Sequence, residues 1–232
     1  MASSVANQAG YTYKHSPYSS HALLVSALPP AAHGERVLDV GCAGGYLAKI
    51  LARRGYKVVG LERAGAQGDS FPEDVELVEA DLDAGLPPLR GAFSYIICGD
   101  ILEHLRDPAA MLRQLASVLA PDGVLIASVP NSGNLYFRLN ILFGRFPQDD
   151  KGLFDRTHLH FYMWKGWREL FESAGFFVDE KKVTGIPIGL TLPKWDGSAV
   201  VRAMESVAYA MARVRPTLFA YQFVVTVRRR TS

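Results

Sequence analysis

Short apolar runs alternate with amphipathic stretches along the first 130 residues. Apolar runs of four to eight residues are typical of buried strands, and apolar side chains that recur every three or four residues indicate helices. The runs that predict strands lie at 36–40, 57–61, 75–79, 93–98 and 124–129. The helical spacing lies at 45–54 and 107–119, where Asp107 and Pro108 form a cap and a first turn. This alternation predicts a parallel sheet with helices on both faces.

The remaining chain predicts further elements of the same fold. Helices are expected at His21–Leu28 and at Trp164–Ala174, where Gly175 follows as a cap, and strands at Phe176–Val183 and Phe219–Val227. Pro121–Gly123 is predicted to be a turn before the strand that begins at Val124. Residues 198–213 place apolar side chains at helical spacing, namely Val200, Val201, Met204, Val207, Ala208 and Met211. We expect this stripe to pack against the domain, with an acceptor lid, a dimer face or a membrane contact as alternatives.

The length of 232 residues fits a single domain. Residues 1–20 are polar and rich in small side chains, which predicts a flexible N-terminal arm, although Tyr11, Tyr13 and His15 could close over a ligand. We therefore place the domain at residues 21–232. The segments at about 132–162 and 185–217 break the alternation and are expected to be insertions that shape the site.

A loop of small residues follows the first predicted strand. Gly41, Ala43 and Gly45 leave bare backbone against which a ligand can lie, and Glu62 follows the second strand, where its two oxygens can accept hydrogen bonds from ribose hydroxyls. The spacing is not the G-x-G-x-x-G of a dinucleotide site. Asp39 precedes the loop and would repel a phosphate but attract a cationic ligand. The pattern predicts a nucleoside ligand with a positive charge.

On these residues the chain resembles the class I methyltransferases, which use S-adenosylmethionine. The resemblance continues through Val78–Leu82, Phe93–Leu105 and Pro121–Val129 and covers roughly Arg36–Asn131. It implies a doubly wound, Rossmann-like α/β fold with a seven-stranded, mostly parallel sheet and an antiparallel edge strand. It also implies that Asp81 binds the adenine amino group. The residues expected around the cofactor are Asp39, Gly41, Cys42, Ala43, Gly45, Glu62, Arg63, Asp81, Leu82 and Gly99.

The stretch Gly152–Tyr162 carries the candidate catalytic residues. His158 and His160 would point to the same face of an extended segment, and a neutral imidazole is the usual proton acceptor at neutral pH. Asp155 or Asp150 could orient one of them. We expect Asn131, Asp155, Arg156 and Tyr162 to contact the acceptor. The Asp-Arg-Thr-His-x-x-Phe pattern is similar to that of ubiquinone-pathway O-methyltransferases and related small-molecule enzymes.

Two other interpretations of these histidines stay open. They could be structural, bonded to loops or backbone carbonyls, and His-x-His with nearby carboxylates could ligate zinc or iron. Because no further histidine or cysteine lies close by along the chain, we assign no metal. His104 follows the fourth strand, and we expect a structural role for it.

Composition limits the classes of partner that we expect. The formal net charge is +2, which gives no electrostatic case for nucleic acid. No apolar run is long enough to span a membrane and no signal peptide is indicated, so we expect a cytoplasmic protein. A homodimer is an open option for its assembly. Cys42 and Cys98 are expected to be packing residues without chemistry.

The expected function is transfer of a methyl group from S-adenosylmethionine to a hydroxyl of a small molecule, such as a bacterial metabolite, a quinone or a sugar. The transfer would be an in-line displacement with a histidine as general base. Three alternatives remain: N-methylation of a small molecule, a protein that binds S-adenosylmethionine without methyl transfer, and a nicotinamide-dependent oxidoreductase, which the glycine spacing disfavours.

Overall fold

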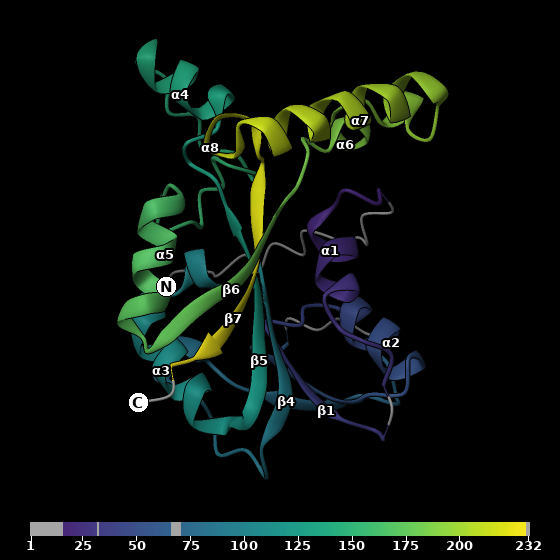
Figure 1. Ribbon diagram of the computed structural model, residues 1–232, viewed down its shortest axis with the longest axis vertical. Coiled ribbons are helices and arrows are strands. Elements are labelled where there is room, and N and C mark those ends of the chain that lie inside the picture. Colours follow the sequence, from purple (N-terminus) through teal and green to yellow (C-terminus); the bar gives the residue numbers. More distant parts are fainter. Residues whose placement is uncertain (1–15, 32, 66–70, 231–232) are drawn as a thin grey trace, which may run out of the picture.

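A computed structural model of the chain describes residues 16–31, 33–65 and 71–230. Most of the predicted N-terminal arm, including Tyr11, Tyr13 and His15, lies outside the described residues. Figure 1 shows a central sheet with helices on both faces and further helices beyond one end of the sheet.

Seven strands form the sheet in the order β3-β2-β1-β4-β5-β7-β6. All neighbouring pairs are parallel except those made by β7, which is antiparallel to both β5 and β6. The predicted antiparallel strand is therefore β7, one place inside the edge strand β6. The strand bounds are β1 (Arg36–Val40), β2 (Lys57–Glu62), β3 (Glu76–Glu79), β4 (Phe93–Gly99), β5 (Leu119–Pro130), β6 (Phe176–Val183) and β7 (Gln222–Arg229).

Helices cover both faces. α1 (Ser20–Ser26) and α2 (Tyr46–Arg53) lie on one face, and α3 (Pro108–Val118) and α5 (Trp164–Ser173) on the other (Figure 1). Beyond the end of the sheet lie α4 (Leu135–Leu142), α6 (Ile188–Thr191), α7 (Ala199–Val214) and α8 (Pro216–Phe219). Three short 3₁₀ turns complete the described elements, at η1 (Leu82–Ala84), η2 (Leu102–His104) and η3 (Pro193–Trp195).

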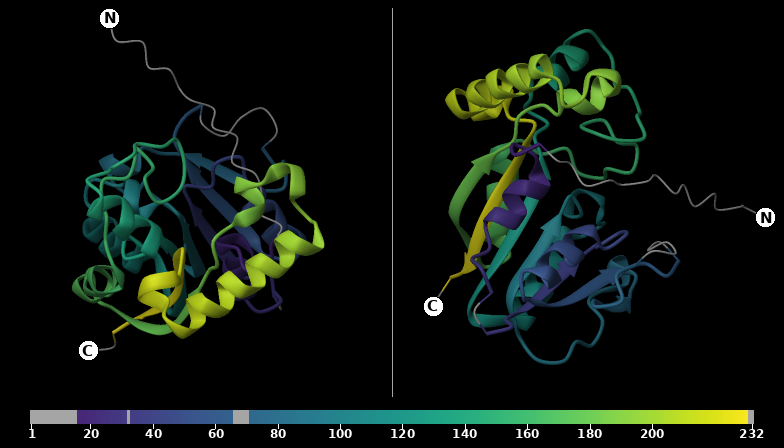
Figure 2. Two further views of the ribbon diagram at one scale, coloured as in Figure 1. Left: turned by 90° about the horizontal axis from the view of Figure 1, so that it is seen from above. Right: turned by 90° about the vertical axis from the view of Figure 1, so that its right-hand side faces the viewer.

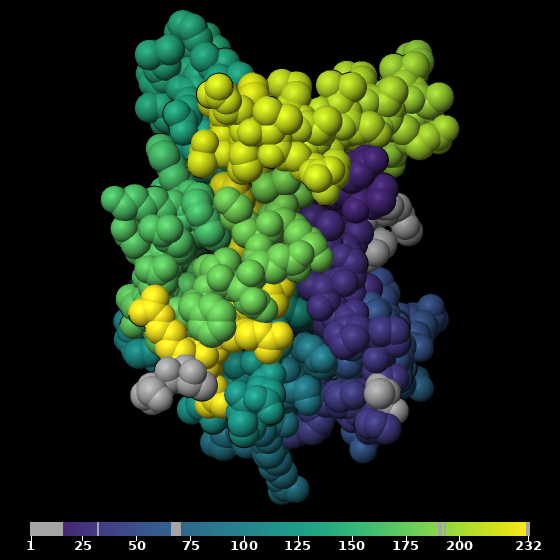
Figure 3. Space-filling view, viewed as in Figure 1, coloured from purple at the N-terminus to yellow at the C-terminus, as the bar shows by residue number. Residues whose placement is uncertain are grey.

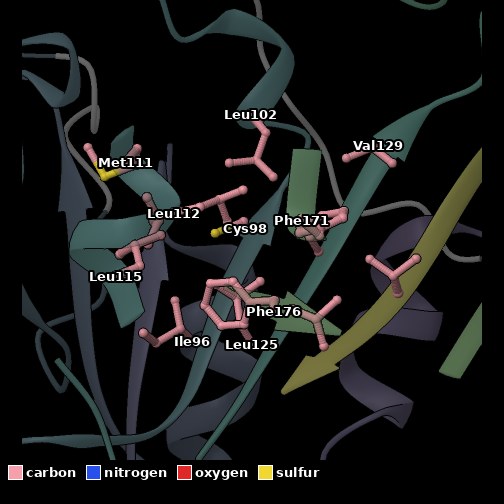
Figure 4. Packing of buried hydrophobic residues seen from close by; sticks show 14 of the residues in the cluster. Ile96, Cys98, Leu102, Met111, Leu112, Leu115, Leu125, Val129, Phe171 and Phe176 are labelled. Carbon is pink, nitrogen blue, oxygen red and sulfur yellow. The ribbon is translucent and has the colours of Figure 1, made fainter. Parts of the chain in front are cut away.

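The sheet separates two hydrophobic cores. Successive residues of a strand point to opposite faces, so Ile96 belongs to the core under α3 and α5, and Ile97 to the core under α1 and α2. Figure 4 shows the first core, in which Leu112 of α3 and Phe171 of α5 gather around the side chains of β4 and β5. Burial on both faces explains why the parallel strands read as continuous apolar runs in the sequence.

Two predicted strand boundaries were wrong. β5 begins at Leu119, and the predicted turn at Pro121–Gly123 lies within it. Because Phe93 pairs with Leu119 while Tyr95 pairs with Val124, the extra residues of β5 bulge out of the ladder there. β7 begins at Gln222, because Pro216, whose ring favours the first helical turn, opens the short helix α8 just before it.

The carboxyl ends of the parallel strands meet at one edge of the sheet. β1, β2 and β4 end there at Val40, Glu62 and Gly99, and β5 ends nearby at Pro130. α7 crosses the molecule beyond this edge (Figure 2). The loops that follow these strands therefore form the candidate site.

Candidate functional site

The loop between β1 and α2 has the backbone that its small residues allow. Gly41, Ala43 and Gly45 have φ angles of 72°, 47° and 72°, in the left-handed region that favours glycine. A Cβ on Gly41 would lie 2.8 Å from the Ile101 side chain, and a Cβ on Gly45 would lie 2.6 Å from Pro72. The backbone amides of Gly41 and Cys42 both donate to the Leu61 carbonyl of β2. The loop is thus held close to the end of β2.

Glu62 is fixed across this loop. Its Oε2 accepts a hydrogen bond from the Ala43 amide at 2.7 Å, and its Oε1 accepts one from the Arg63 amide at 2.8 Å. A carboxylate has about four acceptor sites, so each oxygen keeps capacity for a ligand hydroxyl. The two amides orient the carboxylate for this purpose.

Asp39 lies under the loop and is only 2% exposed. Burial, and then the charge of Glu62, raise its pKa from 3.8 to about 7, while the Ala48 amide opposes the shift. Among the described residues, no group hydrogen-bonds its Oδ2. A buried carboxyl of this kind is stabilised in its charged form by a cation. S-adenosylmethionine, whose ammonium and sulfonium groups are cationic, fits this position.

A cavity of about 170 Å³ joins these groups, and we call it the cofactor pocket. Six predicted cofactor residues line it, namely Asp39, Gly41, Cys42, Ala43, Glu62 and Gly99. Six further residues that were not predicted also line it, namely His21, Tyr46, Leu47, Asp100, Ile101 and His104. The fold brings most of the sequence-predicted set together around one space.

Four predicted cofactor residues lie outside the lining of this pocket. Gly45 caps α2, and Asp81 caps the turn at Leu82 by accepting from the Asp83 amide. Arg63 reaches Asp81, with Nη2 3.4 Å from Oδ1, and both side chains are exposed. The contact of Asp81 with adenine stays a prediction, as do the cofactor contacts of Gly45, Arg63 and Leu82.

A family model described as a methyltransferase domain matches residues 14–181, which is most of the chain. The chain belongs to the S-adenosylmethionine-dependent methyltransferases. This confirms the family and the cofactor that the loop and Glu62 predicted. Among the described residues of the methyltransferase, the cofactor pocket lies where that fold predicts it.

The curated relatives match over part of their length. A ubiquinone biosynthesis O-methyltransferase of Xanthomonas euvesicatoria is 37% identical over 123 residues, which are 47% of this chain and 48% of the relative. One from Psychrobacter arcticus is 33% identical over 107 residues, or 42% of each chain. The methyltransferase thus spans about half the length of the curated relatives it matches.

Solved structures match the whole fold. An S-adenosylmethionine-dependent methyltransferase from Mesorhizobium loti aligns with a TM-score of 0.64 at 17% identity, over 91% of this chain and 98% of that one. The 1,6-didemethyltoxoflavin-N1-methyltransferase of Burkholderia thailandensis aligns with a TM-score of 0.56 at 16% identity, over 91% and 77%. The [4+2]-cyclase SpnF aligns with a TM-score of 0.58 at 18% identity, over 91% and 80%. At these identities the likeness shows the fold alone.

The histidines take different positions in the methyltransferase. His160 has both ring nitrogens engaged, with Nε2 2.8 Å from the Leu105 carbonyl and Nδ1 3.2 Å from the Tyr162 hydroxyl. His158 is buried with Nε2 3.9 Å from Oε1 of Glu103, and burial, then His104, lower its pKa to about 4. Neither lines the cofactor pocket, whereas His104 does. The geometry therefore favours His104 over the two predicted bases.

One cluster has the spacing of a metal site. One ligand atom each of Glu103, His104 and His158 lies within 4.8 Å of the others. We assigned no metal because no further histidine lies close along the chain, but the fold brings His104 and Glu103 to His158. These three residues are the candidates for a divalent cation.

The predicted acceptor residues have structural contacts. Asn131 is fully buried, donates to the Ala220 carbonyl at 2.9 Å and accepts from the Gly133 amide. Arg156 pairs with Asp150 at the surface, and Tyr162 packs edge-on against Trp167. Asp155, which is buried, accepts from the amide and hydroxyl of Thr157. None of the four predicted acceptor residues lines either cavity described here.

A second cavity, of about 490 Å³, lies between residues 16–20, the chain that follows β6, the start of β7 and α7. We call it the acceptor cavity. Gln222 lines it and donates from Nε2 to Oδ1 of Asp100 at 2.8 Å, and Asp100 lines the cofactor pocket. The two cavities therefore share the wall formed by this hydrogen bond.

Sequence reasoning missed this cavity. Residues 16–20 were assigned to a flexible arm, yet Ser16 donates to Glu205 of α7 at 3.0 Å and Tyr18 stacks on Tyr209 with ring centroids 4.4 Å apart. The available signal was the predicted insertion at 185–217, which supplies most of the other wall. The partners of that insertion come from the opposite end of the chain, which local patterns do not show.

Proposed function

We propose that the methyltransferase transfers a methyl group from S-adenosylmethionine to a hydroxyl of a small molecule bound in the acceptor cavity. Two observations support this proposal. The acceptor cavity and the cofactor pocket meet at Asp100 and Gln222, and the curated relatives are named O-methyltransferases. The cavity has the size range of small-molecule sites.

The observation that carries the proposal is a hydrogen-bond chain that ends on His104. The Thr157 hydroxyl donates to Oδ1 of Asp155 at 2.6 Å, so its oxygen can accept from Nδ1 of His104 at 3.0 Å. The Thr157 carbonyl lies 3.2 Å from the same nitrogen. Both contacts favour the proton on Nδ1, which leaves Nε2 as the acceptor. In this proposal Asp155 orients His104 through Thr157, in place of the predicted His158 or His160.

The protein's contribution to the reaction is position and proton transfer. S-adenosylmethionine, when bound, supplies a methyl group on a positively charged sulfur. Asp39 and Glu62 would hold this cofactor, which would give its methyl group to the acceptor oxygen and would be left as a neutral thioether. Nε2 of His104 takes the hydroxyl proton, a contribution of about 10²- to 10⁴-fold. His158 packs against His104 with ring centroids 4.7 Å apart, and burial lowers the pKa of His158 to about 4, which makes His158 a poor base at neutral pH.

A pair of probe acceptors tests the base. In His104→Gln, we expect kcat with a dihydroxybenzene to fall by about 10²-fold or more, and kcat with the matching diaminobenzene to fall less, because an amine needs less help with its proton. Binding of S-adenosylhomocysteine should stay within about threefold. His33→Gln, an exposed histidine away from both cavities, is the matched control.

Two results would contradict this assignment. An unchanged kcat in His104→Gln would show that His104 is not the general base. Activity that chelation abolishes and a divalent cation restores would assign Glu103, His104 and His158 to a metal instead.

The SpnF structure motivates one alternative, because a [4+2]-cyclase shares this fold. Such a protein would bind S-adenosylmethionine without methyl transfer, and formation of S-adenosylhomocysteine in the presence of an acceptor separates the two functions. The single domain at residues 21–232, the cytoplasmic location and the absence of a nucleic-acid partner stay predictions.

A further inference from the structure

The outward face of α7 is apolar and exposed. Val207 is 60% exposed, and Val200, Met204, Met211 and Val214 share this face at intervals of three or four residues. The prediction that the stripe packs against the domain was wrong for these residues. Only its flank does so, with Val201 buried.

A second apolar group lies at the same end of the molecule. α4 and the turn after it expose large side chains, and Leu142 and Phe143 are 75% and 70% exposed. Figures 1 and 2 show α4 and α7 together beyond the end of the sheet, and Figure 3 shows them as the two outermost parts of that end. We call the residues 135–146 and 199–215 the docking face.

The docking face has a net positive charge. It contains five arginines, Arg138, Arg145, Arg202, Arg213 and Arg215, and one acidic residue, Glu205. Arg202 and Glu205 both line the acceptor cavity, where Glu205 accepts from Ser16 and from the Gly189 amide, so the other four arginines supply the charge of the outward side. The whole chain has a formal net charge of only +2, so positive charge is concentrated at this end.

The combination of exposed apolar side chains and arginines favours one of two possible binding partners for the docking face. A twofold contact between two copies would bring the same basic surface against itself and place arginines near arginines. An anionic lipid surface instead offers negative headgroups to the arginines and an acyl layer to the apolar side chains. Within the described part of the chain, no helix is long and apolar enough to cross a membrane.

We propose that the docking face binds the surface of an anionic lipid bilayer. Val201, Arg202 and Glu205 of α7 line the acceptor cavity, so docking through the opposite side of α7 would hold this cavity close to the lipid. The proposal goes beyond the proposed function and does not depend on it, because lipid binding needs no methyl transfer.

Vesicle sedimentation tests the proposal with the full chain. We expect binding to vesicles of phosphatidylcholine with phosphatidylglycerol, little binding to phosphatidylcholine alone, and weaker binding at high salt. The double variant Leu142→Glu and Val207→Glu should lower the bound fraction about tenfold or more. Both positions are solvent-exposed, and retained binding of S-adenosylhomocysteine would verify the fold.

The control is Phe177→Glu, which adds one of these two negative charges at an exposed aromatic residue on the edge strand β6, outside the docking face. It should bind vesicles like the unmodified chain. Absence of binding to anionic vesicles, or equal binding by the double variant, would overturn the proposal. So would a dimer in analytical ultracentrifugation that Val207→Glu dissociates, because a second copy would then cover this face.

Discussion

At the scale of single residues, Asp39 links stability to cofactor binding. It is buried without a partner for Oδ2 among the described residues, and its pKa is raised to about 7. A carboxyl with a raised pKa holds its proton more tightly in the folded chain. Its contribution to stability is therefore full below about pH 4 and is lost as the pH rises to about 7. In the ligand-free protein the charged form of Asp39 lowers stability. A bound cationic cofactor would stabilise this charged form.

Asp39→Asn should separate the two effects. At pH 8 the neutral amide avoids the buried charge, so we expect Tm of the ligand-free protein to rise by about 3 °C or more. At pH 5, where Asp39 is mostly protonated, the difference should shrink. Binding of S-adenosylmethionine at pH 8 should weaken at least about tenfold. A scan of Tm against pH checks this, and a variant that is less stable than the unmodified chain at pH 8 would argue against a raised pKa.

The residue types near the cofactor pocket were predictable because each is tied to a local feature of the backbone. Glu62 ends one strand and Gly41 follows another with left-handed backbone, and both positions are visible in the sequence spacing. The proposed role of His104 was not predicted, because its hydrogen-bond partner Thr157 is 53 positions away along the chain and only the fold brings them together. The contact of His160 could not be predicted for the same reason, since its partner Leu105 lies 55 positions earlier.

At the scale of elements, the loop before α2 leaves little room for added volume. Gly45 has φ 72° and its Cβ would meet Pro72 at 2.6 Å, whereas Gly144 has φ 66° with open space around it. Both positions therefore require left-handed backbone, but only one is crowded.

Gly45→Ala and Gly144→Ala should differ for this reason. We expect Gly144→Ala to lower the free energy of unfolding by about 1 kcal/mol, the cost of left-handed backbone alone. Gly45→Ala should cost more and should also weaken binding of S-adenosylhomocysteine at least about tenfold, because the loop carries the Ala43 amide that holds Glu62. Denaturant unfolding and calorimetry measure both. Equal costs for the two variants would contradict the crowding at Gly45.

Elements with strong periodicity were predicted nearly to the residue, as Phe176–Val183 shows. The starts of β5 and β7 were wrong because a bulge and a proline-led helix override local turn and strand signals. The cavity beside α7 was not predicted, because its walls come from both ends of the chain, which only the tertiary fold joins.

At the scale of the whole molecule, the cofactor pocket lies between β1, β2 and β4, which belong to both hydrophobic cores. A ligand that binds only the folded chain stabilises all of it. At about one hundred times its Kd, S-adenosylhomocysteine should add about 2.7 kcal/mol, which corresponds to roughly 5 to 10 °C in Tm. NADH should cause no shift, and a shift with NADH alone would favour the oxidoreductase alternative.

Calorimetry with S-adenosylmethionine on the intact chain and on Glu62→Ala tests the central claim most directly. The account predicts micromolar binding to the intact chain and a loss of more than about tenfold in the variant, because Glu62 accepts from the Ala43 amide and is proposed to bind the ribose. Glu76→Ala, which removes an exposed carboxylate at the start of β3, should bind normally. No binding to the intact chain, or an unchanged Kd in Glu62→Ala, would contradict the account.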